Sequence, residues 1–136
     1  MSPDEKRKEL QDWIQKNMIS DEFEILSSYK ERIARIVGIT SSGNIVFRVN
    51  LSTFDNKLRI AFYLIGKLMA YFVEKVEKPA ASNKEIESIL GIPKGTVGRS
   101  LKELREQYIV RQMERGLHEI IVNKIPEIIE CTEKQV

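Results

Sequence analysis

Side chains that could bind an anion gather between Lys94 and Gly116, a stretch with six basic and three acidic residues. Arg99 and Lys102 stand three residues apart, which places them on one side of a helix. An arginine fork can pair with the O6 and N7 acceptors of guanine, whereas lysine and hydroxyl groups suit phosphate oxygens. The chemistry that this pattern predicts is recognition of a polyanion such as a nucleic acid.

Two short helices are predicted to position these side chains. Ser82 and Glu85 form a capping box at the start of a helix over 82–90, and Gly91 supplies the left-handed conformation that ends it. Pro93 allows a second helix, over 94–107, to begin at once. Each helix is expected to bury one apolar side. The residues predicted on these buried sides are Ile86, Ile89, Leu90, Val97, Leu101, Leu104 and Tyr108.

A β-hairpin is predicted directly after the second helix, where two apolar runs within 109–122 flank a turn. Before the helix pair, apolar residues recur at helical spacing over 54–77, and Lys78-Pro79 ends that pattern. Three helices followed by a hairpin, or wing, predict a winged helix-turn-helix domain over 52–126.

The sequence from Ser82 to Val110, SNKEIESILGIPKGTVGRSLKELREQYIV, resembles the helix-turn-helix and the start of the wing in winged-helix transcription regulators. It is similar in style to the MarR-like and ArsR-like families and to short archaeal regulators. The stretch from Leu90 to Val97, followed by Leu101, also resembles the helix-turn-helix of bacterial sigma factors, but the wing argues against that family. The resemblance implies a DNA-binding regulator whose second helix reads the major groove.

We therefore expect helix 94–107 to enter the groove by its N-terminal end. Arg99 is the residue expected at a base edge. Gly98 would allow close approach, and that is a reason to carry a glycine that costs about 1 kcal/mol relative to alanine inside a helix. The expected DNA-binding residues are Lys94, Gly95, Thr96, Gly98, Arg99, Lys102, Arg111 and Arg115.

Structural explanations compete for the same residues. Arg99 precedes Glu103 by four residues, as Lys102 precedes Glu106, so both cations could form surface ion pairs. Gly98 could instead accommodate a neighbouring helix. Arg115, at the turn of the wing, could be a solvated side chain that contacts nothing. The polar side of helix 94–107 could likewise be solvated.

The rest of the chain is predicted to complete an α+β fold that is mainly α. An N-terminal helical arm is expected over 1–31, a β-hairpin over 32–51 and a C-terminal tail over 127–136. The arm begins at a Ser2 cap followed by Pro3.

Two elements could join a pair of copies. Helix 54–77 is apolar on two sides, and the N-terminal helix places Leu10, Trp13 and Ile14 on one stripe. Regulators that bind palindromic DNA usually double their contact through two-fold symmetry. The expected partners are therefore double-stranded DNA and a second copy of the chain.

Composition argues against several classes of function. One cysteine and one histidine among 136 residues make a metal site or a cofactor unexpected. His118 is predicted to be an ordinary residue of the wing and Cys131 an inert thiol, and no catalytic constellation points to an enzyme. No apolar run approaches the roughly 18 residues of a membrane span. With no secretory signal visible, a cytoplasmic protein is expected.

The sequence leaves two other functions open. A net charge of only +2 and the Glu103/Glu106 pair suit a winged helix that docks on another protein of the transcription or replication machinery. Binding through the hairpin at 32–51 is a third possibility, with the winged helix as its structural support. The basic face of that hairpin would consist of Arg32, Arg35, Arg48, Lys57 and Arg59.

Overall fold

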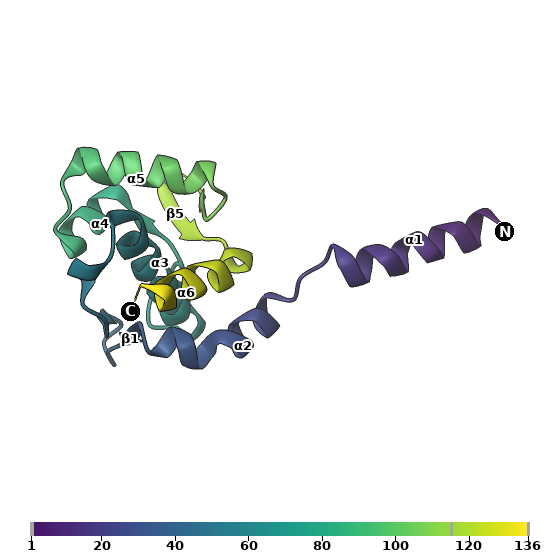
Figure 1. Cartoon of the computed structure of the whole chain (residues 1–136), viewed down its shortest axis with the longest axis horizontal. Helices are drawn as coiled ribbons and strands as arrows, with labels where there is room; N and C mark the ends of the chain where they lie inside the picture. Colours follow the sequence, from purple (N-terminus) through teal and green to yellow (C-terminus); the bar gives the residue numbers. More distant parts are fainter. Residues whose placement is uncertain (1, 115, 136) are drawn as a thin grey trace.

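The chain is α+β and mainly helical, as the sequence predicts (Figure 1). The computed structural model describes residues 2–114 and 116–135. Two small antiparallel sheets accompany the helices. The elements are α1 (Pro3–Asn17), α2 (Glu22–Ala34), β1 (Val37–Ile39), β2 (Ile45–Phe47), the 3-10 turn η1 (Leu51–Thr53), α3 (Asn56–Phe72), β3 (Ala81–Ser82), α4 (Asn83–Leu90), α5 (Lys94–Glu106), β4 (Val110–Gln112), β5 (Leu117–Ile120), the 3-10 turn η2 (Val122–Lys124) and α6 (Ile125–Lys134).

Helix α3 is the centre of the core. The Asp55 side chain accepts a hydrogen bond from the Leu58 amide and so caps its first turn. Ile60 and Leu64 lie on one side of the helix and Phe62 lies on nearly the opposite side, yet all three are fully buried. The β1–β2 hairpin packs against α3 on one side, and α4, α5, α6 and β5 contact it elsewhere. The apolar surface of α3 is thus covered almost entirely within one chain.

The β1–β2 hairpin approaches α3 closely at one glycine. Val37 pairs with Phe47 and Ile39 with Ile45 across the two strands. A Cβ atom on Gly66 of α3 would lie 2.6 Å from the Ile45 Cγ2, well inside van der Waals contact. Only glycine lets the hairpin sit this close to the helix.

Helices α4 and α5 lie where the sequence predicts two helices. Ser82 caps α4 by accepting a hydrogen bond from the Glu85 amide, and Gly91 ends it in the left-handed conformation with φ +64°. Strand β5 pairs with β4 and also with β3, the two residues just before α4. This third strand, which the sequence did not predict, anchors the start of α4 to the hairpin that follows α5.

Three expected boundaries were wrong. The central helix ends at Phe72 rather than 77, because Glu74 adopts a left-handed conformation (φ +58°) before the proline is reached. Residues 32–34 belong to α2, so the first hairpin is shorter than 32–51. The expected tail over 127–136 largely forms helix α6, because Ile128, Ile129 and Thr132 recur on one side and are buried in the core.

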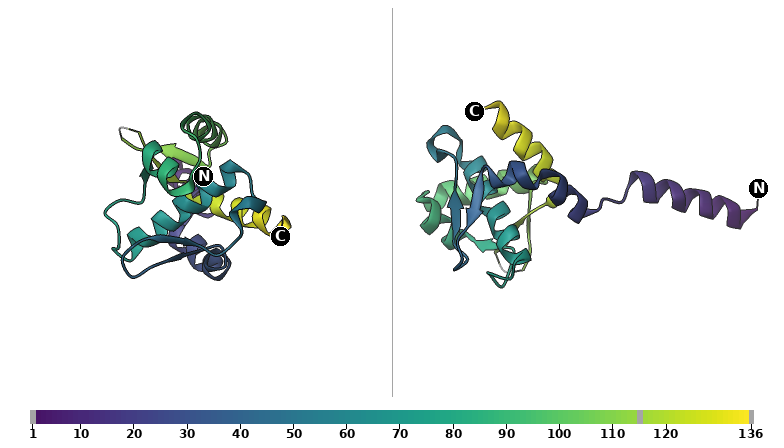
Figure 2. Two further views of the ribbon diagram at one scale, coloured as in Figure 1. Left: turned by 90° about the vertical axis from the view of Figure 1, so that its left-hand side faces the viewer. Right: turned by 90° about the horizontal axis from the view of Figure 1, so that it is seen from below.

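Helix α1 projects away from the other elements (Figure 1; Figure 2, right). Ser2 caps it and Pro3 opens it, as the sequence predicts. None of its residues is buried. Within the described residues, no helix has the length and apolar character that crossing a membrane requires.

Candidate nucleic-acid interface on helix α5

The inward side of α5 holds the helix in a fixed orientation. Val97, Leu101 and Leu104 are buried, and the helix contacts α3 and α4. Two predictions about the buried sides were wrong. Tyr108 lies beyond the end of α5 in a left-handed conformation and is 73% exposed, and Ile89 on α4 is 54% exposed. The apolar stripe of α5 therefore ends one turn earlier than its sequence spacing predicts.

The opposite side of α5 is uncovered. Lys94, Gly95, Arg99 and Lys102 are exposed. Thr96 and Gly98 are half-buried and lie in the same N-terminal part of the helix. The structure thus places six of the eight predicted site residues together on one helix.

The surface ion pairs that offered the alternative explanation for Arg99 and Lys102 do not form along α5. Glu103 turns toward α3 instead, where its Oε2 lies 3.6 Å from the Lys57 Nζ. Among residues 2–114 and 116–135, neither Arg99 nor Lys102 makes an ion pair. Both cationic groups are left available for an external anion.

The two glycines of α5 face open space. Apart from the adjoining residues and the backbone of α5 itself, a Cβ atom added at Gly95 or at Gly98 would meet no atom within 4 Å. Packing against a neighbouring helix of the same chain therefore does not explain either glycine. What remains is the approach of something outside the chain, or no requirement at all.

The N-terminus of α5 carries no side-chain cap. Pro93 occupies the N-cap position and offers no side-chain acceptor, whereas α4, α3 and α2 are each capped by an oxygen atom. The first amide groups of a helix need an acceptor, and the helix dipole makes that end weakly positive. An anion such as phosphate can satisfy them.

The β4–β5 hairpin contributes less positive charge than the sequence predicts. Arg111 donates from its Nε to the carboxylate of Glu119, which is buried at the base of the hairpin. The ion pair partly neutralises Arg111, although its side chain stays largely exposed. Arg115, the other predicted contact, lies outside the described residues.

His118 joins three elements beneath α5. It is 3% exposed on β5, with its Nε2 2.7 Å from the Asn83 Oδ1 of α4 and its Nδ1 3.5 Å from the Arg105 Nη1 of α5. Burial, and then the positive charge of Arg105, lower its pKa. The neutral ring therefore donates from Nε2 to Asn83 and accepts at Nδ1. Asn83 and Arg105 lie 35 and 13 residues from His118 in the sequence, so residue spacing could not predict these contacts.

A second polar cluster ties α4 to α3. The Tyr63 hydroxyl donates to the Glu85 Oε2 at 2.5 Å, and the Lys67 Nζ lies 3.1 Å from the same oxygen. Burial of the phenol, and then its contact with Glu85, raise the pKa of Tyr63. Glu85 is thus used for tertiary contact rather than only for the capping box that the sequence predicts. The cluster fixes α4 relative to the core.

The cations expected on the first hairpin are mostly engaged within the chain. Arg59 donates from its Nε to the backbone oxygens of Leu51 and Phe54, and Arg48 donates to the Ala34 oxygen at 2.8 Å. Arg32 pairs with Glu133 of α6, and Lys57 with Glu103 as described above. These contacts hold elements together, which disfavours the hairpin as a binding surface.

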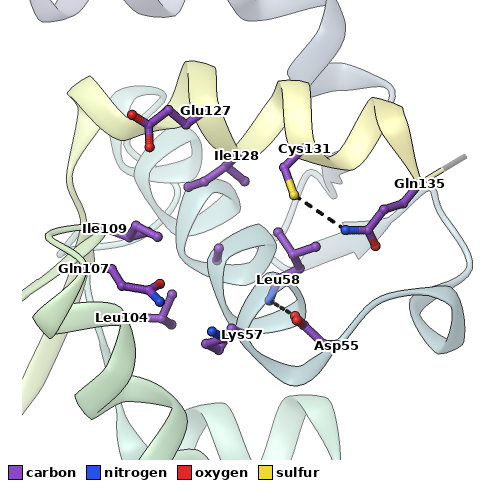
Figure 3. A pocket seen from close by; sticks show the side chains of 11 residues that line it. Asp55, Lys57, Leu58, Leu104, Gln107, Ile109, Glu127, Ile128, Cys131 and Gln135 are labelled. Carbon is purple, nitrogen blue, oxygen red and sulfur yellow. Dashed lines mark hydrogen bonds between the residues drawn. The ribbon is translucent and has the colours of Figure 1, made fainter.

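A cavity of about 260 Å³ opens beside the C-terminal end of α5 (Figure 3). Leu58 of α3, Leu104 of α5 and Ile128 of α6 give it an apolar wall, and Lys57 and Gln107 bring polar groups. Cys131 lies at its edge with its Sγ 3.5 Å from the Gln135 Nε2. Within the described residues, no group of histidine, cysteine and carboxylate side chains is arranged to hold a metal ion.

Comparisons of the chain with protein-family models, with curated proteins and with solved structures give no match.

Proposed function

We propose that this chain is a DNA-binding protein of the winged helix-turn-helix type that regulates transcription, with α5 as the helix that enters the major groove. The observation that carries the proposal is the uncovered cationic side of α5, where Arg99 and Lys102 are exposed and lack an acidic partner among the described residues. The order of α4, a three-residue turn, α5 and the β4–β5 hairpin supports the proposal, because a helix-turn-helix and a wing follow one another in this order in that fold.

The roles follow from position along α5. Its uncapped N-terminus, Lys94 and the Thr96 hydroxyl suit phosphate groups at the groove edge. Arg99, one turn further on, is placed to reach a base edge with its guanidinium fork. Gly95 and Gly98 remove side chains from the surface that would lie nearest to the DNA backbone.

The network beneath α5 supports this assignment. A reading helix must keep its angle to the groove, because a small rotation moves every base contact. His118 with Arg105 and Asn83, and Tyr63 with Glu85, fix α4 and α5 against the core with polar contacts that depend on direction.

The test begins with selection of bound sequences from random duplex DNA, followed by salt titration of the best binder. Affinity should fall steeply with salt because bound lysine and arginine displace counterions. We expect Arg99→Ala to weaken binding of the selected site by about 1–3 kcal/mol and to relax its sequence preference. Lys94→Ala should weaken all duplexes alike and reduce the salt slope by about 1.

Lys30→Ala is the matched control, because Lys30 is an exposed lysine on α2, outside the α5 interface. It should leave both affinity and salt slope unchanged. Equal binding by wild type, Arg99→Ala and Lys94→Ala would remove α5 from the interface.

A protein-docking function is the second candidate, and one observation favours it. Tyr108 and Ile89 are exposed apolar side chains at the ends of the same helix pair, while Arg111 is partly neutralised by Glu119. Such a surface suits a protein partner better than phosphate. Absence of binding to any duplex at low salt would favour this function over DNA recognition.

A further inference from the structure

Helix α1 exposes an apolar stripe that nothing in its own chain covers. Leu10 and Trp13 are 59% and 56% exposed, and the half-buried Ile14 lies next to Leu10 on the same side. Met18, the C-cap residue, is also exposed. Lys6 and Arg7 flank the stripe toward the N-terminal end. A 15-residue helix with no buried residue is only marginally stable in water. The helix therefore needs a partner surface.

The surface area of the whole chain makes the same point. It exposes 8929 Å², whereas a compact monomer of 15.8 kDa exposes about 7,300 Å². The excess of about 1,600 Å² exceeds the roughly 800 Å² that each partner buries in a standard protein interface. The projecting α1 is the part of the molecule that departs from a compact shape (Figure 1).

A second uncovered apolar surface lies where α2 begins and α3 ends. Phe23 of α2 and Phe72 of α3 have ring centroids 5.5 Å apart, and Tyr71 lies 6.4 Å from Phe72. All three are exposed aromatic side chains. We call Phe23, Tyr71 and Phe72 the aromatic patch. Three acidic residues, Asp21, Glu22 and Glu24, surround Phe23 in sequence and line the hollow beside it.

We propose that two copies of this chain form a dimer by exchanging α1, with the Leu10–Trp13–Ile14 stripe of each copy packed on the aromatic patch of the other. The charges agree with this pairing, because Lys6 and Arg7 beside the stripe would meet the acidic residues around Phe23. In a dimer with two-fold symmetry this contact forms twice, so the stripe and the aromatic patch of both copies are buried.

The same chain does not offer α1 an equivalent place. Folding back along α2 would lay the stripe on the outer side of that helix, where Ser27, Lys30 and Glu31 are exposed and polar. Helix α3, the other candidate for a dimer contact, is covered by its own chain except at Tyr71 and Phe72. A second copy is thus the occupant that fits both the stripe and the aromatic patch.

The proposal stands apart from DNA recognition, and full-length protein without DNA tests it. Sedimentation velocity over a dilution series should show a species of twice 15.8 kDa that dissociates as concentration falls. Trp13 is the only tryptophan, so its fluorescence reports on α1 alone. Its emission should shift to shorter wavelength as the dimer forms and the indole leaves water.

Leu10→Glu and Phe72→Ser address the two halves of the contact. Both residues are exposed in the single chain, so neither change should unfold it. Each should raise the dimer dissociation constant on the order of tenfold or more. Lys8→Gln changes the charge of α1 by the same amount on the side opposite the stripe and should leave the dissociation constant unchanged.

Three results would overturn the proposal. The first is a monomer at every concentration with constant Trp13 emission. The second is a dimer that Leu10→Glu and Phe72→Ser weaken no more than Lys8→Gln does. The third is a monomer whose Trp13 emission shifts only when vesicles of anionic lipid are added, which would assign α1 to a membrane surface.

Discussion

A side chain at Gly98 is expected to have opposite effects on helix stability and on the proposed DNA binding. Its Cβ position is open, so alanine fits there without contact. Because alanine favours the helix, Gly98→Ala should raise the free energy of unfolding by about 0.5–1 kcal/mol, measured by urea denaturation. If DNA approaches this side of α5, the added methyl group should at the same time weaken binding in a gel-shift titration.

Gly66→Ala is the matched control for this substitution. Its Cβ would lie 2.6 Å from Ile45, so the same change in the middle of α3 should lower stability rather than raise it. A stabilised Gly98→Ala variant that binds its best duplex as tightly as wild type would mean that no backbone approaches α5 at this point.

Residue periodicity was sufficient to predict which side of α5 faces outward. Val97 and Leu101 are buried and Arg99 and Lys102 are exposed, as the spacing indicates. Spacing could not predict pairings across long separations. Arg111 has its partner on the next strand, and Lys57 takes Glu103 away from Arg99, because tertiary packing brings those groups together.

At the scale of elements, local sequence signals predicted most of the helices but not the contacts between them. Ser2, Ser82 and Gly91 begin or end helices where capping chemistry predicts. The sheet partner β3 is only two residues long and carries no alternating pattern, so sequence could not reveal it. Helix α6 was not predicted within the expected tail, because its apolar side is short and contacts the core only in the folded chain.

His118 makes the junction of β5, α4 and α5 sensitive to pH. Burial lowers its pKa in the folded state, so the unfolded chain takes up a proton first as pH falls through about 6.5. Stability should therefore be complete above this pH, decline below it and level off only below the folded-state pKa. Urea unfolding at a series of pH values between 7.5 and 5 measures the decline.

His118→Gln is the variant that isolates this effect. It removes the titrating ring, so its stability should fall less between pH 7.5 and 5 than that of wild type, with the carboxylates contributing equally to both. At pH 7.5 the variant should be less stable by about 1–3 kcal/mol, because a buried partner of Asn83 is lost or displaced. Identical pH slopes in the two proteins would show that His118 is not the group responsible.

At the scale of the whole molecule, α1 differs from the rest of the chain in how it is packed. Residues after Asp21 form one core around α3, and no residue of α1 takes part in it. The sequence predicted the apolar stripe of α1 but also an apolar α3 open to a partner. The structure covers α3 except at Tyr71 and Phe72, and it leaves the stripe and the aromatic patch exposed.

A chain that begins at Asp21 separates the two proposals in one experiment. It keeps the N-cap of α2 and the entire core, so it should fold with a thermal midpoint that does not depend on concentration. The full-length chain should instead show a midpoint that rises with concentration, because association stabilises the folded state by mass action.

The truncated chain should bind a single half-site as tightly as the full-length chain does, since α5 is intact, but lose affinity for a palindromic site, which needs two joined copies. Equal loss at both sites would place α1 in the DNA contact itself, and no loss at either would mean that α5 acts without a dimer.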